Sequence, residues 1–291
     1  MDKLVSLLTK ESKYIVFDND TIKSSNGLDN LSFTEDGTYY VFNNVTSERN
    51  IDIVINEGVN VNIIEFISIK ENANINCNIN CKANSSLELV TLYESNNSKA
   101  VINANTVMEE KSYFNSKGLS LFMSEVDSKY DEKLVGEKAK VEAYNVFINN
   151  SEKTQDFVLN TYHNIKETES MVRNFAICKG TSTLNINTNG IVINGSKQSN
   201  ISQKTKGILL SSESGISANP LLQIDEYDCL ASHGAGIGAI DEEDLFYLMS
   251  RGLTKLESEK LIIGGFVNPI YEAINNEELR NAVLNKVSKY L

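Results

Sequence analysis

Short segments in which apolar and polar residues alternate occupy most of the chain between about Tyr39 and Ile224. A period of two is typical of β-strands with one buried face. Short polar turns separate the segments and are rich in Gly and Asn, the residues that most readily adopt positive φ. The alternating segments include 51-IDIVI-55, 59-VNVNII-64, 75-INCNINC-81, 87-LELVTLY-93, 141-VEAYNVFI-148, 184-LNINT-188 and 191-IVI-193.

The spacing of the turns favours a β-solenoid over a meander. The turn residues Gly58, Asn72 and Asn84 follow one another at intervals of 14 and 12 residues, which is close to the spacing of solenoid coils. In a solenoid each coil covers one face of its neighbours, so strands can be short and turns uniform. A many-stranded β-sandwich is the alternative. The only two prolines, Pro220 and Pro269, agree with a continuous hydrogen-bonded sheet.

After about residue 240 the apolar period becomes helical. Asp241 is the expected N-cap of a first helix, which Gly252 would end. Thr254 and Glu257 predict a capping box for a second helix, which we expect to end at 264-GG-265. A last helix is predicted from about Asn276, with an apolar stripe formed by Leu279, Val283 and Val287.

These patterns divide the sequence into three parts. Residues 1–38 are predicted to hold a short helix over the first ten residues and a lead-in. Residues 39–240 form the β core, and residues 241–291 form a C-terminal helical subdomain. The predicted fold class is therefore all-β with an α-helical cap.

Composition and charge exclude some classes of partner. The net charge of −12 argues against nucleic acid and anionic membrane, which require clustered Lys and Arg. The N-terminus, MDKLVSLLTKESKY, lacks the features of a signal peptide, and no apolar run reaches the ~18 residues of a membrane span. We therefore expect a cytoplasmic protein with reduced cysteines.

Several candidate sites are weak when their spacing is considered. Cys77 and Cys81 would lie about 13 Å apart on one strand, too far for a disulfide or a shared zinc, so both are expected to be buried thiols. Gly234, Gly236 and Gly238 precede four carboxylates that would repel phosphate, so a tight turn from strand to helix is expected instead of a phosphate loop.

The two histidines have different surroundings. His163 lies in the polar stretch 161-TYHNIKETES-170 and is expected to be exposed. His233 follows Cys229 by four residues, and imidazole and thiolate are both ligands for iron, zinc and copper. On a straight strand the two side chains are too far apart to share an ion. On chemistry alone, a structural role for His233 ranks above a ligand role.

The stretch 231-ASHGAGIGAIDEEDLFYLMSRGLTKLESEKLIIGGF-266 resembles the C-terminal signature of the SufB/SufD family of iron–sulfur cluster assembly scaffolds. Family members read A/C-S-H-G-A-T-V-G-x-L-D-E-E-x-L-F-Y-L-x-S-R-G-L there, and their second helix ends in G-F. Residues 189–228 resemble the last β-coils of the family, and the resemblance is good from about residue 160 onward. At two positions the sequence departs from the SufB-type (B-type) members of the family, and both departures make it resemble the SufD-type members. Thr205 stands at the position of a B-type cysteine, and Gly234 replaces a Glu after the histidine.

The resemblance implies a right-handed parallel β-helix and a non-catalytic scaffold. Such a subunit pairs through its β-helix with a SufB-like subunit, or with itself in a homodimer. It is served indirectly by a cysteine desulfurase and carries a transient iron–sulfur cluster at the subunit junction. The resemblance places His233 near that junction as a tentative cluster or metal ligand, with Cys229 as a weaker candidate. The sequence is shorter than that of typical members, so we expect a minimal version.

The resemblance further implies that an ABC-type, SufC-like ATPase docks on the C-terminal helices. The residues expected to take part are Asp241, Glu242, Leu245, Phe246, Arg251 and Gly252. Two other interpretations remain: a secreted-type β-helix that binds or cleaves acidic polysaccharide, and a purely structural solenoid. The acidic charge and the absence of a signal peptide weigh against the first of these.

Overall fold

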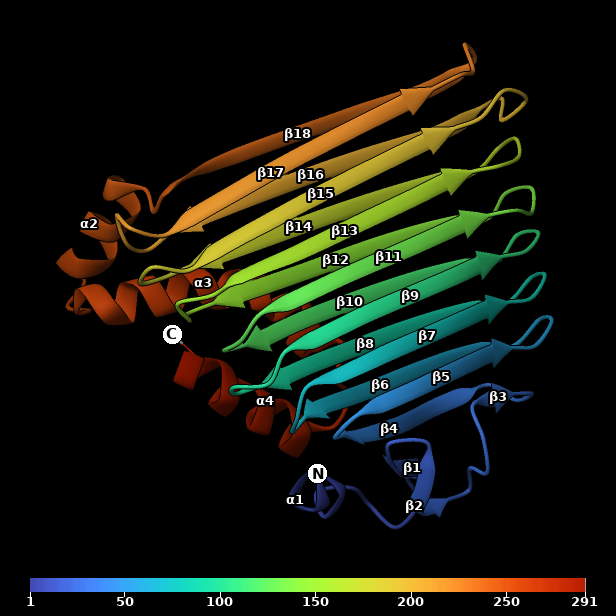
Figure 1. Cartoon of the computed structure of the whole chain (residues 1–291), viewed down its shortest axis with the longest axis horizontal. Helices are drawn as coiled ribbons and strands as arrows, with labels where there is room; N and C mark the ends of the chain where they lie inside the picture. Colours follow the sequence, from blue (N-terminus) through green and yellow to red (C-terminus); the bar gives the residue numbers. More distant parts are fainter. Residues whose placement is uncertain (291) are drawn as a thin grey trace.

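The computed structural model describes residues 1–290 and shows a parallel β-solenoid of about eight turns with helices packed on one side (Figure 1). Each coil contributes one strand to each of two facing sheets. The order is β18-β16-β14-β12-β10-β8-β6-β4-β1-β2 in the ten-stranded sheet and β17-β15-β13-β11-β9-β7-β5-β3 in the eight-stranded sheet. All paired strands are parallel except β1 and β2. The predicted solenoid is therefore confirmed.

The bounds of the strands are as follows. They are β1 (Lys13–Asp18), β2 (Thr21–Asn26), β3 (Ser32–Phe33), β4 (Gly37–Val45), β5 (Glu48–Ile55), β6 (Asn60–Ile69), β7 (Ala73–Cys81), β8 (Ser86–Ser95), β9 (Ala100–Met108), β10 (Tyr113–Phe122), β11 (Val126–Leu134), β12 (Lys140–Asn149), β13 (Thr154–His163), β14 (Glu169–Cys178), β15 (Thr183–Val192), β16 (Ser199–Leu209), β17 (Gly215–Ile224) and β18 (Cys229–Ala239). The helices are α1 (Asp2–Val5), α2 (Glu242–Ser250), α3 (Lys255–Glu272) and α4 (Glu277–Tyr290).

The length of one coil follows from the strand register. Ser86 pairs with Asn60 in one direction and with Tyr113 in the other, so a coil there takes 26 or 27 residues. The predicted interval of 12 to 14 residues is therefore half a coil, one strand and one corner. Gly58 and Asn84 both adopt positive φ at such corners, as their residue types predict.

The N-terminal segment contains more strand than the sequence pattern indicates. Helix α1 spans only Asp2–Val5, shorter than the ten residues expected. Strand β1 then extends the ten-stranded sheet by pairing with β4, and β3 extends the other sheet by pairing with β5.

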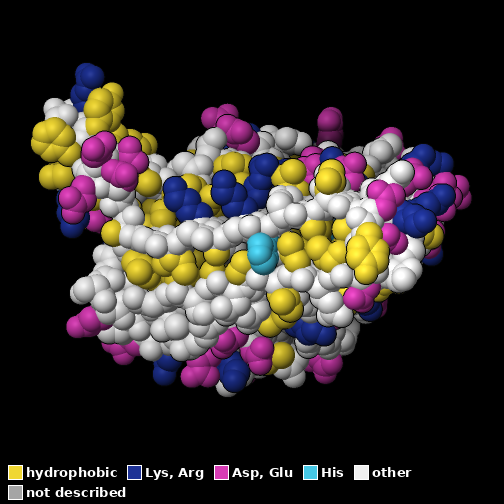
Figure 2. Space-filling view, turned by 90° about the horizontal axis from the view of Figure 1, so that it is seen from above, with side chains coloured by type: hydrophobic (Ala, Val, Ile, Leu, Met, Phe, Trp, Pro, Cys, Tyr) yellow, Lys and Arg dark blue, Asp and Glu magenta, His cyan; other side chains and the backbone are white. Residues whose placement is uncertain are grey.

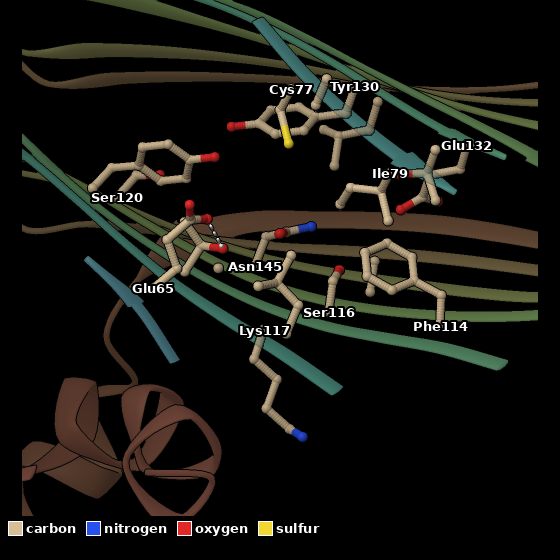
Figure 3. A pocket seen from close by; sticks show the side chains of 18 of the residues that line it. Glu65, Cys77, Ile79, Phe114, Ser116, Lys117, Ser120, Tyr130, Glu132 and Asn145 are labelled. Atoms are coloured by element: carbon tan, nitrogen blue, oxygen red, sulfur yellow. Dashed lines mark hydrogen bonds between the residues drawn. The ribbon is translucent and has the colours of Figure 1, made fainter. Parts of the chain in front are cut away.

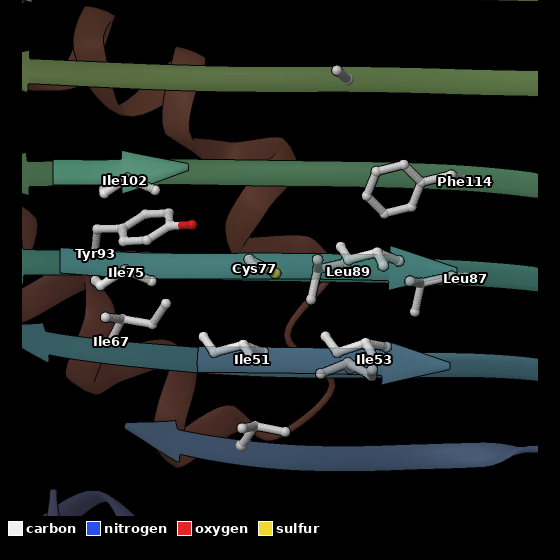
Figure 4. Packing of buried hydrophobic residues seen from close by; sticks show 14 of the residues in the cluster. Ile51, Ile53, Ile67, Ile75, Cys77, Leu87, Leu89, Tyr93, Ile102 and Phe114 are labelled. Atoms are coloured by element: carbon white, nitrogen blue, oxygen red, sulfur yellow. The ribbon is translucent and has the colours of Figure 1, made fainter. Parts of the chain in front are cut away.

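Two apolar cores hold the molecule together. The first fills the space between the sheets, where side chains from successive coils lie in rows along the stacking direction (Figure 4). Ile51, Ile53 and Ile75 are fully buried there, and burial of one such side chain contributes about 1.5–3 kcal/mol. The second core lies between the outer face of the ten-stranded sheet and the helices. It contains the predicted stripe of α4, with Leu279 and Val283 fully buried.

Helix α3 departs from its predicted length. The capping box of Thr254 and Glu257 is confirmed, but the helix continues through 264-GG-265 to Glu272 and includes Pro269. Glycine inside a helix costs about 1 kcal/mol. The buried side chains of Ile263, Val267 and Ile270 pack on the sheet on both sides of the glycines, so tertiary packing outweighs local propensity. No helix within residues 1–290 has the length and apolar character needed to cross a bilayer.

The prediction that His163 is exposed is wrong. Its side chain is fully buried, with Nδ1 2.7 Å from the Thr168 hydroxyl and Nε2 2.7 Å from the Ser170 hydroxyl. Burial lowers the pKa of His163 to about 4. The polar neighbours in the sequence are thus its buried hydrogen-bond partners, and the ring is a structural element of the coil.

Asparagine ladders bind neighbouring coils on the outer face of the eight-stranded sheet. Asn160 donates to Asp131 at 2.7 Å, and Asn189 in the next coil donates to Asn160 at 2.8 Å. Asn76 donates to Asn50 at 3.1 Å in the same manner. Each bond joins side chains that the parallel register places opposite one another, so the abundance of Asn has a structural use.

A cavity of about 70 Å³, lined mainly by apolar surface together with the carboxyl groups of Glu65 and Glu132, lies between the two sheets (Figure 3). Glu65 of β6 accepts hydrogen bonds there from Asn43 at 2.9 Å and Thr91 at 3.3 Å. Glu132 of β11 lines the cavity from the other sheet and accepts one from Thr161 at 3.1 Å. Glu132 is half-buried because it borders this cavity. Burial raises the pKa of each carboxyl to about 7. The Arg49 charge and the hydrogen bonds oppose this rise at Glu65, and the hydrogen bond from Thr161 opposes it at Glu132.

Because the pKa values of Glu65 and Glu132 are raised in the folded protein, we predict that its free energy of unfolding falls as pH rises. Between the ordinary value of 4.5 and about 7, the folded protein keeps protons that the unfolded protein has lost. The free energy of unfolding therefore decreases across this window, and the full cost of the buried charges is present above about pH 7. Glu132→Gln should raise the free energy of unfolding at pH 8 by roughly 3 kcal/mol and leave it unchanged at pH 4.

Urea unfolding at pH 4, 6 and 8 measures this effect. The exposed Glu213→Gln serves as the matched control, and its pH profile should follow that of the unmodified protein. Equal stabilities of Glu132→Gln and the unmodified protein at pH 8 would contradict the prediction.

Candidate functional site at the open end of the solenoid

The last coil of the solenoid has no neighbour on one side. Strands β17 and β18 stand at the ends of their sheets, and both are largely exposed. Figure 2 looks down onto this end and shows hydrophobic side chains along the coil with a histidine among them. An edge strand presents unpaired N–H and C=O groups, and two such edges lie here side by side with the apolar side chains between them.

The register shows which side chains of the last coil face inward. His233 lies opposite Gln203, and Gln203 is buried between the sheets, so His233 points to the same interior side. Its ring is nevertheless exposed, because no further coil covers it. The side chains that share this inward face include Ile216, Ala218, Leu222, Ala231, Ala235 and Ile237.

Cys229 shares the inward face with His233 but differs in environment. It is half-buried, and its Sγ donates to the Glu226 carbonyl oxygen at 3.3 Å. Burial and the nearby Glu226 and Asp228 carboxylates raise the pKa of the thiol. Four residues on a strand separate Cys229 from His233 by about 13 Å, so the two cannot bind one ion. Within residues 1–290, no three His, Cys, Asp or Glu residues are grouped to hold a metal.

The prediction that the glycines form a turn is wrong. Gly234, Gly236 and Gly238 all lie inside β18 and pair with β16 in register. None of the three adopts positive φ. His233 therefore stands inside a strand, and the change of direction toward the helix occurs only after Ala239. The ladder of hydrogen bonds to β16 outweighs the low strand propensity of glycine.

Helix α2 begins directly after β18 and has no buried residue. Asp241 is its N-cap and accepts a hydrogen bond from the Glu243 N–H at 2.7 Å, as predicted. Phe246 is 75% exposed, and Tyr247 is also exposed with the Arg251 guanidinium over its ring. Leu245 is half-buried, and Gly252 adopts the positive φ expected after the helix. The helix thus carries an exposed aromatic surface with an acidic first turn.

The sequence pattern did not reveal the apolar part of this end. Ile237, Leu221 and Leu230 are exposed on the last coil, and Tyr227 is fully exposed in the corner between β17 and β18. Leu221, Leu230 and Ile237 lie in strands, where the sequence pattern does not distinguish exposed from buried positions, and Tyr227 lies outside any strand. The signal that identifies them is position, because they fall in the last coil before the helical pattern begins.

The four cysteines agree with the expectation of free thiols. Cys77, Cys81 and Cys178 are buried between the sheets, and none of the four forms a disulfide. Burial raises the pKa of Cys81 to about 12 and that of Cys178 to about 11. These three thiols are therefore structural members of the core.

Comparison with known proteins identifies the fold and the end of the solenoid with one family. Residues 40–266 match the family described as "SUF system FeS cluster assembly, SufBD core domain". The chain is 30% identical over 156 residues to the iron–sulfur cluster assembly protein SufD of Bacillus subtilis, covering 54% of this chain and 36% of the relative.

Two further relatives have names that point to the same family. The iron–sulfur cluster assembly protein SufD of Escherichia coli is 34% identical over 84 residues, covering 29% of this chain and 20% of the relative. A SufBD family protein of Mycobacterium bovis is 30% identical over 144 residues, covering 50% of this chain and 17% of the relative. The matched parts thus span between 17% and 36% of the length of these curated relatives. Because the family match covers most of the sequence and includes both His233 and α2, the chain belongs to the SufBD family of iron–sulfur cluster assembly proteins.

Proposed function

We propose that this protein is a non-catalytic scaffold subunit of a SUF-type iron–sulfur cluster assembly complex in the cytoplasm. The observation that carries the proposal is the uncovered last coil, which exposes two strand edges and an apolar inward face around His233. The relatives named SufD support the assignment to cluster assembly.

The partner at the open end is a second solenoid of the same family, either a SufB-like subunit or a second copy of this protein. A second solenoid can continue both sheets, because it brings its own pair of strand edges and its own apolar inward face. Pairing would satisfy the backbone groups of β18 and bury Ile237 and Leu222. Pro220 removes one backbone donor from β17, so β18 is the better edge for strand pairing.

His233 is the residue that we assign to the nascent cluster at this junction. The cluster is cargo that passes through the complex, with sulfur supplied by a cysteine desulfurase. Neutral imidazole is a good iron ligand, and the His233 ring lies on the uncovered inward face, where it can meet ligands of the paired subunit. Cys229 is the weaker candidate, because a thiol binds iron as thiolate and its raised pKa disfavours that form.

Helix α2 and the residues around it are the docking surface for an ABC-type ATPase. Phe246 and Tyr247 offer exposed aromatic area of the kind found at the centres of interfaces, and Arg251 lies beside them. Asp241, Glu242, Leu245 and Gly252 complete this surface. ATP hydrolysis then belongs to the partner, and closure of two ATPase subunits would act on the junction through α2.

His233→Ala should reduce cluster formation without separating the subunits. We expect the iron retained by the anaerobically reconstituted complex to fall by about tenfold or more, because a first ligand is lost. Iron and sulfide analysis with Mössbauer spectra measures the loss. Ser232→Ala, which faces outward on the same strand, is the control and should behave as the unmodified protein. An unchanged cluster yield in His233→Ala would reduce His233 to a structural residue.

Ile237→Glu should weaken pairing at the open end. The substitution places a charge on the inward apolar face, and we expect the dissociation constant to rise at least about tenfold. Analytical ultracentrifugation of the protein alone and with the SufB-like subunit measures it. Ile193→Glu is the matched control, since Ile193 is 40% exposed and Ile237 43% exposed, and Ile193 lies outside the last coil. Pairing that survives in Ile237→Glu would rule out this edge.

Phe246→Ala should weaken docking of the ATPase. Loss of a central aromatic contact costs about 2 kcal/mol or more, roughly a thirtyfold change in affinity. Isothermal titration with the purified ATPase measures it, and the solenoid should keep its thermal stability because Phe246 is not part of either core. Leu284→Ala, an exposed apolar residue of α4, is the control. Wild-type affinity of Phe246→Ala would argue against α2 as the docking surface.

A further inference from the structure

The helices leave the last two strands of the ten-stranded sheet uncovered on part of their outer face. The second apolar core uses outer-face residues of this sheet as far as Phe175 and Ile177 of β14. Phe266 of α3 stacks on Phe175 at 5.0 Å between ring centroids. Next to this contact the outer face of β16 and β18 presents Lys204, Lys206 and the glycines of β18. This bare area is bordered by α2 and α3.

Nothing in the protein itself requires the three glycines. A Cβ atom added at Gly234, Gly236 or Gly238 would meet no other atom within 4 Å, and none of the three has positive φ. Gly190 is different, because a Cβ there would lie 2.2 Å from Ile201 Cδ1. Glycine inside a strand costs about 0.5–1 kcal/mol relative to alanine and is typical where another backbone approaches closely. Three such residues in alternation therefore indicate a close contact with something outside this protein.

Three basic side chains flank the bare strand, with Asp241 and Asp244 on the α2 side of the same recess and Glu142 near Arg173. Arg173, Lys204 and Lys206 come from neighbouring outward positions of β14 and β16. Within residues 1–290, none of the three forms a salt bridge with Asp or Glu, although the net charge is −12. Lys206 instead lies over the Phe266 ring at 5.0 Å. Figure 2 shows basic side chains gathered beside the open end.

Gly236, Gly238, Lys204 and Lys206 belong to one recess that is continuous with α2, and Gly234 lies two residues before Gly236 on β18. Its floor is formed by β16 and β18, and its wall by Ile262 and Phe266 of α3. Asp241 and Asp244 at the start of α2 line the same recess. A protein that docks on α2 from this side therefore extends over the bare strand. A solenoid paired at the β18 edge would lie in the plane of the sheet and would not fill the recess.

We propose that an acidic segment of the ATPase partner packs its backbone against Gly234, Gly236 and Gly238, with its carboxylates on Arg173, Lys204 and Lys206. The proposal rests on the proposed function and adds a second contact to the α2 surface. The contact requires two properties of the partner segment. It must be narrow or flat enough to reach the strand backbone, and it must be negatively charged.

The test combines binding of the purified ATPase with thermal unfolding of the isolated full-length protein. Gly236→Val should unfold at the same temperature as the unmodified protein or higher, because a Cβ atom at this position meets no other atom within 4 Å and valine favours strands. Its affinity for the ATPase should nevertheless fall at least about tenfold. Lys204→Glu should weaken binding by about tenfold at low salt and reduce the salt dependence of binding.

Matched controls lie on the other sheet. Ser217→Val adds similar bulk to the exposed outer face of β17, and Lys133→Glu makes the same charge change on β11. Both should bind the ATPase like the unmodified protein. Wild-type affinity of Gly236→Val and Lys204→Glu, with weakened binding of Phe246→Ala, would overturn this inference and leave the α2 docking surface intact.

Two other outcomes are equally decisive. If the unmodified protein fails to bind the ATPase at all, the proposed docking and this inference both fall. If Gly236→Val loses pairing with the second solenoid but keeps its affinity for the ATPase, the occupant of the recess is the solenoid, and our assignment is wrong.

Discussion

The structure depends on one constraint: the interior side chains of each coil are covered along the stacking direction only by the coils above and below it. Parallel pairing in register joins neighbouring coils in both sheets, and the interior rows are buried only where a further coil follows. At the N-terminal end the chain closes the stack itself, because Leu28, Leu31 and Phe33 fold into the core and the antiparallel β1–β2 pair ends the larger sheet. At the C-terminal end the chain turns into α2 instead, so the last coil stays uncovered within the described residues.

The same constraint explains what the sequence could predict. Alternation identified strands because every interior row is built from alternate residues, and Thr254 with Glu257 identified a helix start because a capping box is local. Helix α4 was found from Leu279, Val283 and Val287 for the same reason, since one apolar stripe meets one surface. The assignment of His233 to a junction came from family resemblance, because one imidazole on a strand carries no functional signal of its own.

Features that depend on neighbouring coils could not be predicted. His163 has polar neighbours in sequence, but these same groups accompany it into the interior. Gly234, Gly236 and Gly238 resemble a turn in isolation, and only the ladder to β16 holds them in a strand. The 26 or 27 residues of one coil were interpreted as two coils, because a corner after each strand looks the same in both sheets. In each case the missing information was the register between coils.

Strand β18 connects the surfaces to which we assign the proposed function. Its inward face carries His233, and its edge pairs with no other described strand. Its outer face carries Gly234, Gly236 and Gly238. Only Ile240 and Asp241 separate β18 from α2. Helices α3 and α4 are anchored on the sheet by buried side chains, whereas α2 has none. If the proposed ATPase docks on α2, only two residues separate its contact surface from the strand that carries His233.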